Sequence, residues 1–271
     1  MAGESVQGEG ELTCSAMGPY LDGELFALDR YHFLESTGST NTEASRLAEA
    51  GAEEGSLVVA DQQIAGRGRL GRLWVSPAGL NLYFSMVLRP AIPPGQASQL
   101  TLLAGVALAE VLGQVGGEEV CLKWPNDLLV GGLKVAGVLT EMAVRGDRVR
   151  HVVLGIGINV NGDGRHFPPE LLPIATTLER GLGRSFSRSL LLAGFLRVFC
   201  RWYRRFLAEG FSPVREAWLG FASVIGRSVA VNLASSRFQG EALDLDAEGY
   251  LLVRDEAGTV RRVVAGDVSL I

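Results

Sequence analysis

The chain has 271 residues, of which 47% are apolar, so it suits one large domain with a small one beside it. Its net charge of −5 at pH 7 provides no global positive field for nucleic acid. Three widely spaced cysteines and three scattered histidines argue against a metal cluster and indicate reduced thiols in a cytoplasmic protein. No apolar run approaches the length of a membrane span, and the first residues lack the pattern of a secretory signal.

The first part of the chain predicts an arm, a helix and a strand. We interpret residues 1–27 as a short, mobile N-terminal arm. A helical pattern opens at 39–43, where Thr40 and Glu43 have capping-box spacing, and Gly51 suits its C-terminal end. The segment SLVVADQQ that follows predicts a buried strand.

A glycine-rich loop at residues 66–72, GRGRLGR, separates this strand from the next elements. Two strand-like runs later flank the dipeptide Gly131-Gly132, which is a signal for a two-residue hairpin. The remaining predicted elements are a strand over 80–90, a helix over 97–114, a buried strand over 148–161, a long amphipathic helix over 187–210 and a shorter helix over 213–223.

The pattern changes after about Ile225 to short strands separated by glycine turns, which is typical of a small β-barrel. We therefore place a domain boundary near Ser223, with one domain over 28–222 and another over 223–271. The first of these should be α+β, with mixed or antiparallel strands and helices on one face of the sheet.

The loop at 66–72 is the sharpest local feature. Its arginines, Arg67, Arg69 and Arg72, alternate with glycines, so the backbone can approach a ligand closely while guanidinium groups bind phosphate oxygens. The spacing is neither that of a P-loop nor that of a dinucleotide-binding turn, and a solvated or RNA-contacting basic loop is the alternative. Because the loop has little apolar material to bury, we expect it to be flexible until it closes over a ligand.

Lysine occurs only at Lys123 and Lys134, and both lie in the segment KWPNDLLVGGLK. A lysine ammonium is a compact point charge, so it suits a cation directed at one oxygen of a reacting carboxylate or phosphate. Chance retention in an arginine-rich composition is the alternative. If the Trp-Pro-Asn stretch is extended, Lys123 and Asp127 lie on the same face of one strand. The alternative is that they form an ordinary surface salt bridge, which contributes little.

Several polar residues and glycines are further candidates. Ser39, Thr40 and Asn41 could cap the predicted helix or present their side chains to a pocket. Gln63 ends a strand just before the loop and is either an edge group or a ligand contact. The glycines of GIGIN at 155–159 indicate either a close approach of a ligand or tight strand packing.

The order and spacing of these segments resemble the biotin protein ligases, also called biotin–acetyl-CoA-carboxylase ligases. The resemblance rests on STN at 39–41, on QxxGRGRxGR beginning at Gln63, on KWPND at 123–127 with a lysine seven residues after the aspartate, and on GxGxN at 155–159. It covers the chain from about Phe33 to the C-terminus.

The resemblance implies a catalytic domain related to the class II aminoacyl-tRNA synthetases and lipoate ligases, followed by an SH3-like barrel. It implies that biotin and ATP, with Mg²⁺, give biotinyl-5′-adenylate and pyrophosphate. The biotinyl group then passes to a lysine of a biotin carboxyl carrier domain. No covalent enzyme intermediate is needed, and no nucleophile–base pair is evident in the sequence.

The resemblance also implies roles for individual residues, although it assigns no metal ligand. Asp127 would orient or deprotonate the acceptor lysine, or help to hold magnesium. The catalytic residues would be Lys134, Arg69, Arg67 and Asp127. The contacts to biotin would be Ser39, Thr40, Asn41, Gln63, Arg67, Gly68, Arg69, Lys134 and Gly137. The contacts to ATP or the adenylate would be Arg69, Arg72, Trp74, Lys123, Asn126 and Asn159.

The chain also departs from some members of this family. About thirty residues precede the matching region, too few for a winged helix-turn-helix, so we expect a monofunctional ligase that binds neither DNA nor membrane. Some members stack adenine on a tryptophan after GxGxN, but LLPIATTLE at 171–179 contains no aromatic residue. Family members often pair through the central sheet, which suggests a homodimer. The alternatives are a lipoate–protein ligase on the same fold and a non-catalytic biotin-binding or nucleic-acid-binding regulator.

Overall fold

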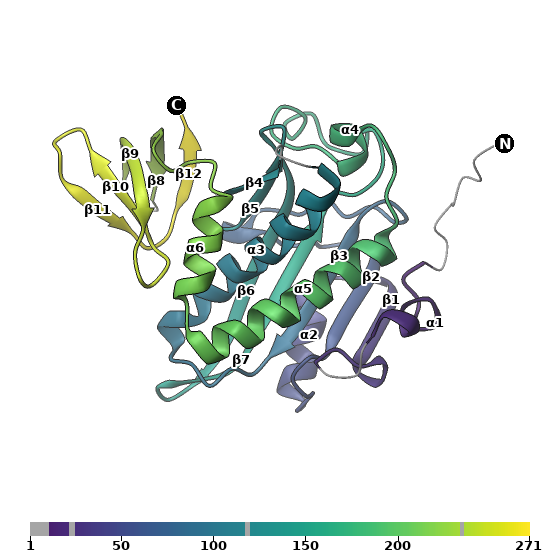
Figure 1. Ribbon diagram of the computed structural model, residues 1–271. Helices are drawn as coiled ribbons and strands as arrows, with labels where there is room; N and C mark the ends of the chain where they lie inside the picture. Colours follow the sequence, from purple (N-terminus) through teal and green to yellow (C-terminus); the bar gives the residue numbers. More distant parts are fainter. Residues whose placement is uncertain (1–10, 22–24, 117–119, 234–235) are drawn as a thin grey trace.

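The computed structural model describes residues 11–21, 25–116, 120–233 and 236–271 (Figure 1). A seven-stranded sheet with helices packed on it forms the larger part. A five-stranded antiparallel sheet forms the C-terminal part and lies beside α6.

The larger sheet is mixed, with the strand order β1-β2-β3-β7-β6-β5-β4. β1 and β2 are parallel, and each of the other neighbouring pairs is antiparallel. The prediction of an α+β domain is therefore confirmed. The strands are β1 Tyr31–Thr37, β2 Leu57–Gln63, β3 Leu82–Leu88, β4 Val120–Lys123, β5 Asp127–Val130, β6 Leu133–Arg145 and β7 Arg148–Ile158.

Three helices cover one face of this sheet and lie in front of it in Figure 1. Strand side chains at alternating positions, such as Leu57 and Met86, belong to the hydrophobic core on that face. Rings from a strand and a helix meet there, with Phe84 and Phe195 5.3 Å apart and Phe195 and Phe199 5.6 Å apart between centroids. The helices are α3 Ala97–Gly116, α5 Arg188–Glu209 and α6 Ser212–Gly220.

The central helix α3 is apolar around most of its circumference. By length and composition the segment Pro94–Gly116 would suffice to cross a membrane, and 61% of its most apolar window is buried inside the protein. The expectation that no segment reaches that length is therefore wrong. The sheet, α5 and α6 cover this apolar surface, as they would for the core helix of a globular domain.

The remaining long helix, α2 (Thr40–Glu49), lies on the opposite face of the sheet. Ala44 and Ala48 pack there against Val58, Val87 and Val153, which alternate with the strand residues that face α5. The expectation of helices on one face only is therefore wrong. In the described residues α2 covers part of this second face, and β6 and β7 line a pocket beside it.

The segment KWPNDLLVGGLK forms two tight turns. Gly131 and Gly132 have φ values of 56° and 81°, which the hairpin between β5 and β6 requires, so this prediction is confirmed. The Trp-Pro-Asn stretch is not extended as we had assumed. It is a turn, and Lys123 pairs directly with Asp127 across it.

The C-terminal sheet has the order β11-β10-β9-β8-β12 and shares one hydrophobic core with the larger domain. The Trp124 indole N–H donates to the Gly249 carbonyl over 3.1 Å, and the Ser223 amide donates to the Leu122 carbonyl over 2.8 Å. These bonds fix the small sheet against the β4–β5 turn. Its strands are β8 Ser228–Asn232, β9 Arg237–Leu245, β10 Leu251–Asp255, β11 Val260–Val263 and β12 Asp267–Leu270.

The N-terminal segment contributes to the core of the protein. Leu12 and Met17 are 1% and 0% exposed, and the Tyr31 hydroxyl donates to the Leu12 carbonyl over 2.6 Å. The expectation of a mobile arm is therefore wrong for residues 11–21, because these residues bury apolar side chains. Residues 1–10 and 22–24 lie outside the described part.

Phe195 tests the core between sheet and α5. We expect Phe195→Ala to lower the free energy of unfolding by about 3–5 kcal/mol, because it removes a fully buried ring from between Phe84 and Phe199. Phe195→Leu should lose clearly less, since it leaves a smaller cavity. Urea unfolding followed by circular dichroism measures both, and equal losses would contradict this account of the core.

Candidate active site

A pocket of about 660 Å³ lies on the face of the large sheet that carries α2. Its wall includes the loop at 66–72, β6, β7, the β4–β5 turn and residues of the C-terminal sheet. The structure brings together here every residue that the sequence singled out for a site. These residues are Ser39, Thr40, Asn41, Gln63, Arg67, Gly68, Arg69, Arg72, Trp74, Lys123, Asn126, Asp127, Lys134, Gly137 and Asn159.

The N-terminus of α2 supplies buried polar groups to this wall. Gln63 Oε1 accepts hydrogen bonds from the Thr40 amide over 2.9 Å and from the Thr40 hydroxyl over 3.2 Å. The Ser85 hydroxyl lies 2.7 Å from Asn41 Oδ1, and Asn41 Nδ2 donates to Glu141 over 2.8 Å. This network fixes donors and acceptors at the pocket wall.

The capping box expected at this helix is absent. Ser39 is the N-cap rather than Thr40, and its side chain makes no capping hydrogen bond. Thr40 lies inside the helix, where its hydroxyl is bound to Gln63. The interpretation of Ser39, Thr40 and Asn41 as plain capping residues is therefore wrong, because their side chains line the pocket instead.

Glycines make room for two site side chains against the sheet. A Cβ added at Gly155 would overlap the Asn41 side-chain amide. One added at Gly157 would lie 2.5 Å from the Trp74 ring, and one at Gly137 would lie 3.1 Å from the same ring. We had interpreted the glycines of GIGIN as a sign of either a close ligand or tight strand packing. Neither interpretation alone describes them, because they let the Asn41 side chain and the Trp74 indole lie directly on β7.

The loop at 66–72 is the tip of an irregular hairpin that we call the lid, residues 63–76. The Gln63 amide donates to the Ser76 carbonyl over 3.2 Å, and the Trp74 amide donates to the Gly66 carbonyl over 2.9 Å. Nearer the tip, the Gly68 amide donates to the Arg72 carbonyl over 2.7 Å. These backbone bonds give the lid the shape of a hairpin. That the loop is flexible until it closes over a ligand stays a prediction.

Each arginine of the lid is bound by a side chain from a different part of the fold. Arg67 donates to Glu141 on β6 over 2.8 Å, and Arg69 donates to Asn126 Oδ1 in the β4–β5 turn over 3.0 Å. Arg72 forms an ion pair with Asp267 on β12. The lid tip is therefore held by the sheet, by the turn and by the C-terminal domain.

Lys134 and Asp127 form an ion pair inside the pocket, with Nζ 2.5 Å from Oδ1. Their side chains are 30% and 18% exposed, so this pair is partly desolvated and differs from the surface pair that we had considered for Lys123 and Asp127. The Lys134 ammonium also lies 5.3 Å from the centroid of the Trp74 ring. Asp127 and Trp74 thus fix the position of the ammonium.

The pocket is electropositive although the whole chain is acidic. Its lining contains five cationic side chains (Arg67, Arg69, Arg72, Lys123 and Lys134) and two carboxylates (Asp127 and Asp267). Burial lowers the pKa of the Arg69 guanidinium below its ordinary value, while Asp267 and Asp127 act in the opposite direction. Such a cleft concentrates anions and strengthens their hydrogen bonds.

No group of three or more metal-ligating side chains occurs in the described residues, so they form no all-protein metal cage. The two carboxylates of the pocket are each paired with a cation. A magnesium ion that arrives with nucleotide phosphates needs only one or two protein oxygens, and this donor set is compatible with such an ion.

Comparison with known proteins decides the family. The biotin/lipoate A/B protein ligase family matches residues 33–159, and the biotin protein ligase C-terminal domain family matches residues 224–271. The bifunctional ligase/repressor BirA of Bacillus subtilis is 41% identical over 240 residues, which cover 89% of this chain and 73% of that protein. The chain belongs to the biotin protein ligase family.

Two further members of the family match the present chain over nearly their whole length. The biotin–[acetyl-CoA-carboxylase] ligase of Paracoccus denitrificans is 37% identical, and the match covers 83% of this chain and 94% of that protein. The biotin protein ligase from Aquifex aeolicus in complex with biotin and ATP has the same fold, with a TM-score of 0.75 and 32% identity over 89% of this chain and 98% of that one.

Sequence reasoning missed several residues of this site. Asp267 lines the pocket from a separate domain, and Ser85 and Glu141 hold site side chains from neighbouring strands. None of these three belongs to a local motif, so no sequence signal could have found them. Residues 171–179 line the pocket with apolar side chains including Leu171 and Ile174, and Phe167, just before them, is an aromatic residue in the same lining.

Gly157 provides a test of the pocket floor. We expect Gly157→Ala to displace the Trp74 indole, because the added methyl group would lie 2.5 Å from the ring. The tryptophan fluorescence spectrum and its quenching by acrylamide should both change. Gly113→Ala in α3 is the matched control, since a Cβ there meets no atom within 4 Å. Unchanged quenching in Gly157→Ala would contradict the packing of Trp74 on this glycine.

Proposed function

We propose that the protein activates biotin with ATP to biotinyl-5′-adenylate and then transfers the biotinyl group to a lysine of a biotin carboxyl carrier domain. The observation that carries this proposal is the convergence of both lysines of the chain and all three lid arginines on one pocket. The structural likeness to a ligase in complex with biotin and ATP supports it.

Biotin has an uncharged ureido ring at one end and a carboxylate at the other. We propose that the polar groups around α2 and Gln63 bind the ring, and that Lys134 binds the carboxylate. The lid would close over both through Arg67, Gly68 and Arg69, with Gly137 beneath. The proposed contacts to the ring end are Ser39, Thr40, Asn41 and Gln63, and those to ATP or the adenylate are Arg69, Arg72, Trp74, Lys123, Asn126 and Asn159.

In the first step a carboxylate oxygen of biotin attacks the α-phosphorus of ATP, and the bond to the bridging oxygen of pyrophosphate breaks. Both reactants are anions, so the residues must offset their repulsion and align them. Lys134 offers a point charge to the oxygen shared by the two, and Arg69 and Arg72 offer guanidinium groups to the phosphates. The Lys134 side chain is 30% exposed, and this partial burial strengthens its interaction.

In the second step the amine of the acceptor lysine attacks the carbonyl carbon of the mixed anhydride, AMP leaves and the nitrogen loses a proton. We propose that Asp127 acts mainly through Lys134, since its 2.5 Å ion pair holds the ammonium beside the Trp74 ring. Magnesium belongs to the substrate in this proposal, as the counter-ion that ATP brings with it.

The finer parts of the proposal concern organisation and partners. We propose a catalytic domain at 28–222, a C-terminal domain at 223–271 and a cytoplasmic protein that functions without DNA or membrane. Exposed Met142 and Val144 near the end of β6 provide apolar surface for a homodimer through the large sheet. Sedimentation at two concentrations tests the dimer, and a gel shift at physiological salt tests DNA binding.

The decisive experiment is incubation of the purified protein with ATP, Mg²⁺, biotin and a biotin carboxyl carrier domain, followed by intact mass spectrometry of the carrier. We expect a gain of one biotinyl group that disappears when the acceptor lysine is changed to arginine. A gain only with lipoate on a lipoyl domain would assign the sister activity. No gain with either acid would favour a binding or regulatory protein.

Lys134 gives a sharper prediction about the first step. We expect Lys134→Ala to slow adenylate formation by about 100- to 1000-fold, because it removes a preorganised cation at the reacting oxygens. Lys134→Arg should also lose much of the activity, since a planar fork does not replace a point charge. Pyrophosphate release measures both rates. Arg254→Ala, on β10, is the control for a lost surface cation. Near-wild-type rates in Lys134→Ala would contradict this role.

A further inference from the structure

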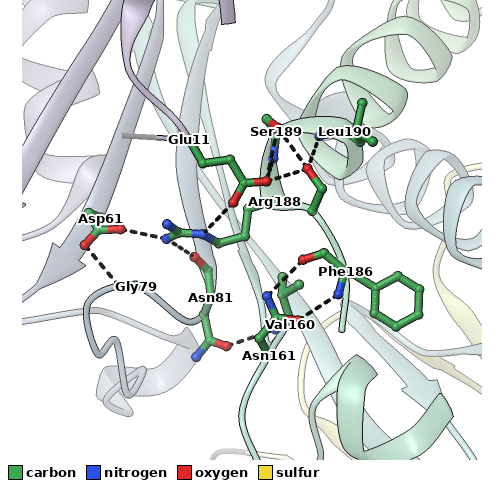
Figure 2. Close-up of polar contacts among 11 residues, drawn as sticks. Glu11, Asp61, Gly79, Asn81, Val160, Asn161, Phe186, Arg188, Ser189 and Leu190 are labelled. Carbon is green, nitrogen blue, oxygen red and sulfur yellow. Dashed lines mark hydrogen bonds and ion pairs between the residues drawn. The ribbon is translucent and has the colours of Figure 1, made fainter. Parts of the chain in front are cut away.

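The two ends of the lid region meet at a buried cation. Arg188, the first residue of α5, is 1% exposed. Its Nη1 donates to Asp61 Oδ1 over 2.6 Å and to the Asn81 carbonyl over 3.2 Å (Figure 2). Asp61 lies in β2 two residues before Gln63, and Asn81 directly precedes β3. One guanidinium group therefore bridges the strand that enters the lid and the segment that leaves it.

Asp61 makes a second link across the same gap. Its Oδ2 accepts the Gly79 amide over 3.0 Å (Figure 2). The bonds between Gln63 and Ser76 and between Gly66 and Trp74 follow in order toward the tip. Asp61 and Arg188 thus form the base of the ladder that carries the lid arginines.

The base also reaches the floor of the pocket. Asn81 Oδ1 accepts the amide of Val160, which follows Asn159 in the chain (Figure 2). The segment that Arg188 holds is therefore bonded both to the lid and to the end of β7, where Asn159 lines the pocket. A shift of this base would move the lid relative to the pocket floor.

A buried guanidinium group requires acidic partners, and two carboxylates of the described residues lie next to this one. The second is Glu11, with Oε2 3.5 Å from Arg188 Nε. Glu11 Oε1 accepts the Ser189 amide over 3.2 Å and the Ser189 hydroxyl over 3.1 Å, so this carboxylate also caps the first turn of α5. Both Glu11 and Asp61 form ion pairs with Arg188. The other bonds of Glu11 go to Ser187 and Ser189 and not to the lid base.

We propose that Arg188 and Asp61 are positioning residues that clamp the base of the lid and set how tightly its arginines close over the bound adenylate. The part that concerns the adenylate rests on the proposed function, whereas the clamp itself is a property of the hairpin. Loss of the Asp61 charge removes the 2.6 Å ion pair of Arg188 to β2 and weakens the hold on Gly79. The base of the hairpin then opens more often, and the tip loses its fixed angle over the pocket.

Hydrogen–deuterium exchange of the lid tests the clamp without any reaction. Asp61→Asn keeps the shape of the side chain and removes its charge. We expect the amides of Gly68 and Trp74, followed in peptides that cover 64–76, to exchange about tenfold faster, as for the loss of a charge-assisted hydrogen bond. Glu11→Gln is the matched control, since it removes a negative charge next to Arg188 that makes no bond to the lid base, and its lid should exchange as in the wild type.

Arg188→Lys provides a second variant. It keeps the charge, but its single nitrogen cannot hold the geometry of a guanidinium group toward Asp61 and Asn81, so lid exchange should again accelerate. Wild-type exchange in both Asp61→Asn and Arg188→Lys would overturn the clamp. Equal acceleration in Glu11→Gln would overturn it as well, because a general loss of stability would then explain the effect.

The functional consequence is measured separately. Adenylate formed on the enzyme is chased with unlabelled biotin and ATP, and we expect Asp61→Asn to release it about tenfold faster. An unchanged release rate despite faster lid exchange would overturn the role in adenylate retention. If the wild type formed no adenylate at all, the proposed function would fail, but the exchange experiment would still decide whether the clamp exists.

Discussion

The constraint on which the rest of the structure depends is the mutual repulsion of five cations in one pocket. Arginine and lysine side chains placed so closely would spread into solvent without fixed acceptors, and four of these five have one. Glu141, Asn126 and Asp267 hold the lid arginines, and Asp127 holds Lys134. These acceptors come from β6, the β4–β5 turn, β12 and β5, so the electrostatics of the pocket require the strands, the turn and the C-terminal domain to be assembled together.

The second requirement is space, and the backbone provides it. The Trp74 ring and the Asn41 amide lie against β7 at Gly157 and Gly155, where any side chain would collide with them. A sheet face normally carries a side chain at each second residue, so two glycines at this spacing open a flat area wide enough for an indole and an amide. The polar end near α2 and the cationic end near Lys134 are therefore held apart on one rigid surface.

A feature could be predicted from the sequence when the residues that determine it lie close together in the chain. Gly131-Gly132 could be predicted as a hairpin because the φ values of a two-residue turn depend on those two residues alone. The capping box at Thr40 was wrong because a partner 23 residues away, Gln63, binds the Thr40 hydroxyl. Asp267 and Arg188 could not be assigned at all, since their importance arises only when distant strands and helices come together. The motif residues were found because resemblance to a family supplies such long-range information indirectly.

The same arrangement explains how a short lid can be both ordered and able to respond to its ligand. Its base is held by the desolvated guanidinium group of Arg188, whose ion pairs with Asp61 and Glu11 are costly to separate once buried. Its tip is held by Arg72 and Asp267, whose side chains are 67% and 29% exposed, and such an exposed pair contributes little. In the proposed function, phosphate oxygens would compete for Arg72 at the tip without disturbing the base. The base of the lid is therefore anchored by a more deeply buried ion pair than the one at Arg72, and in the proposed function a charge-assisted contact to phosphate would replace that exposed pair.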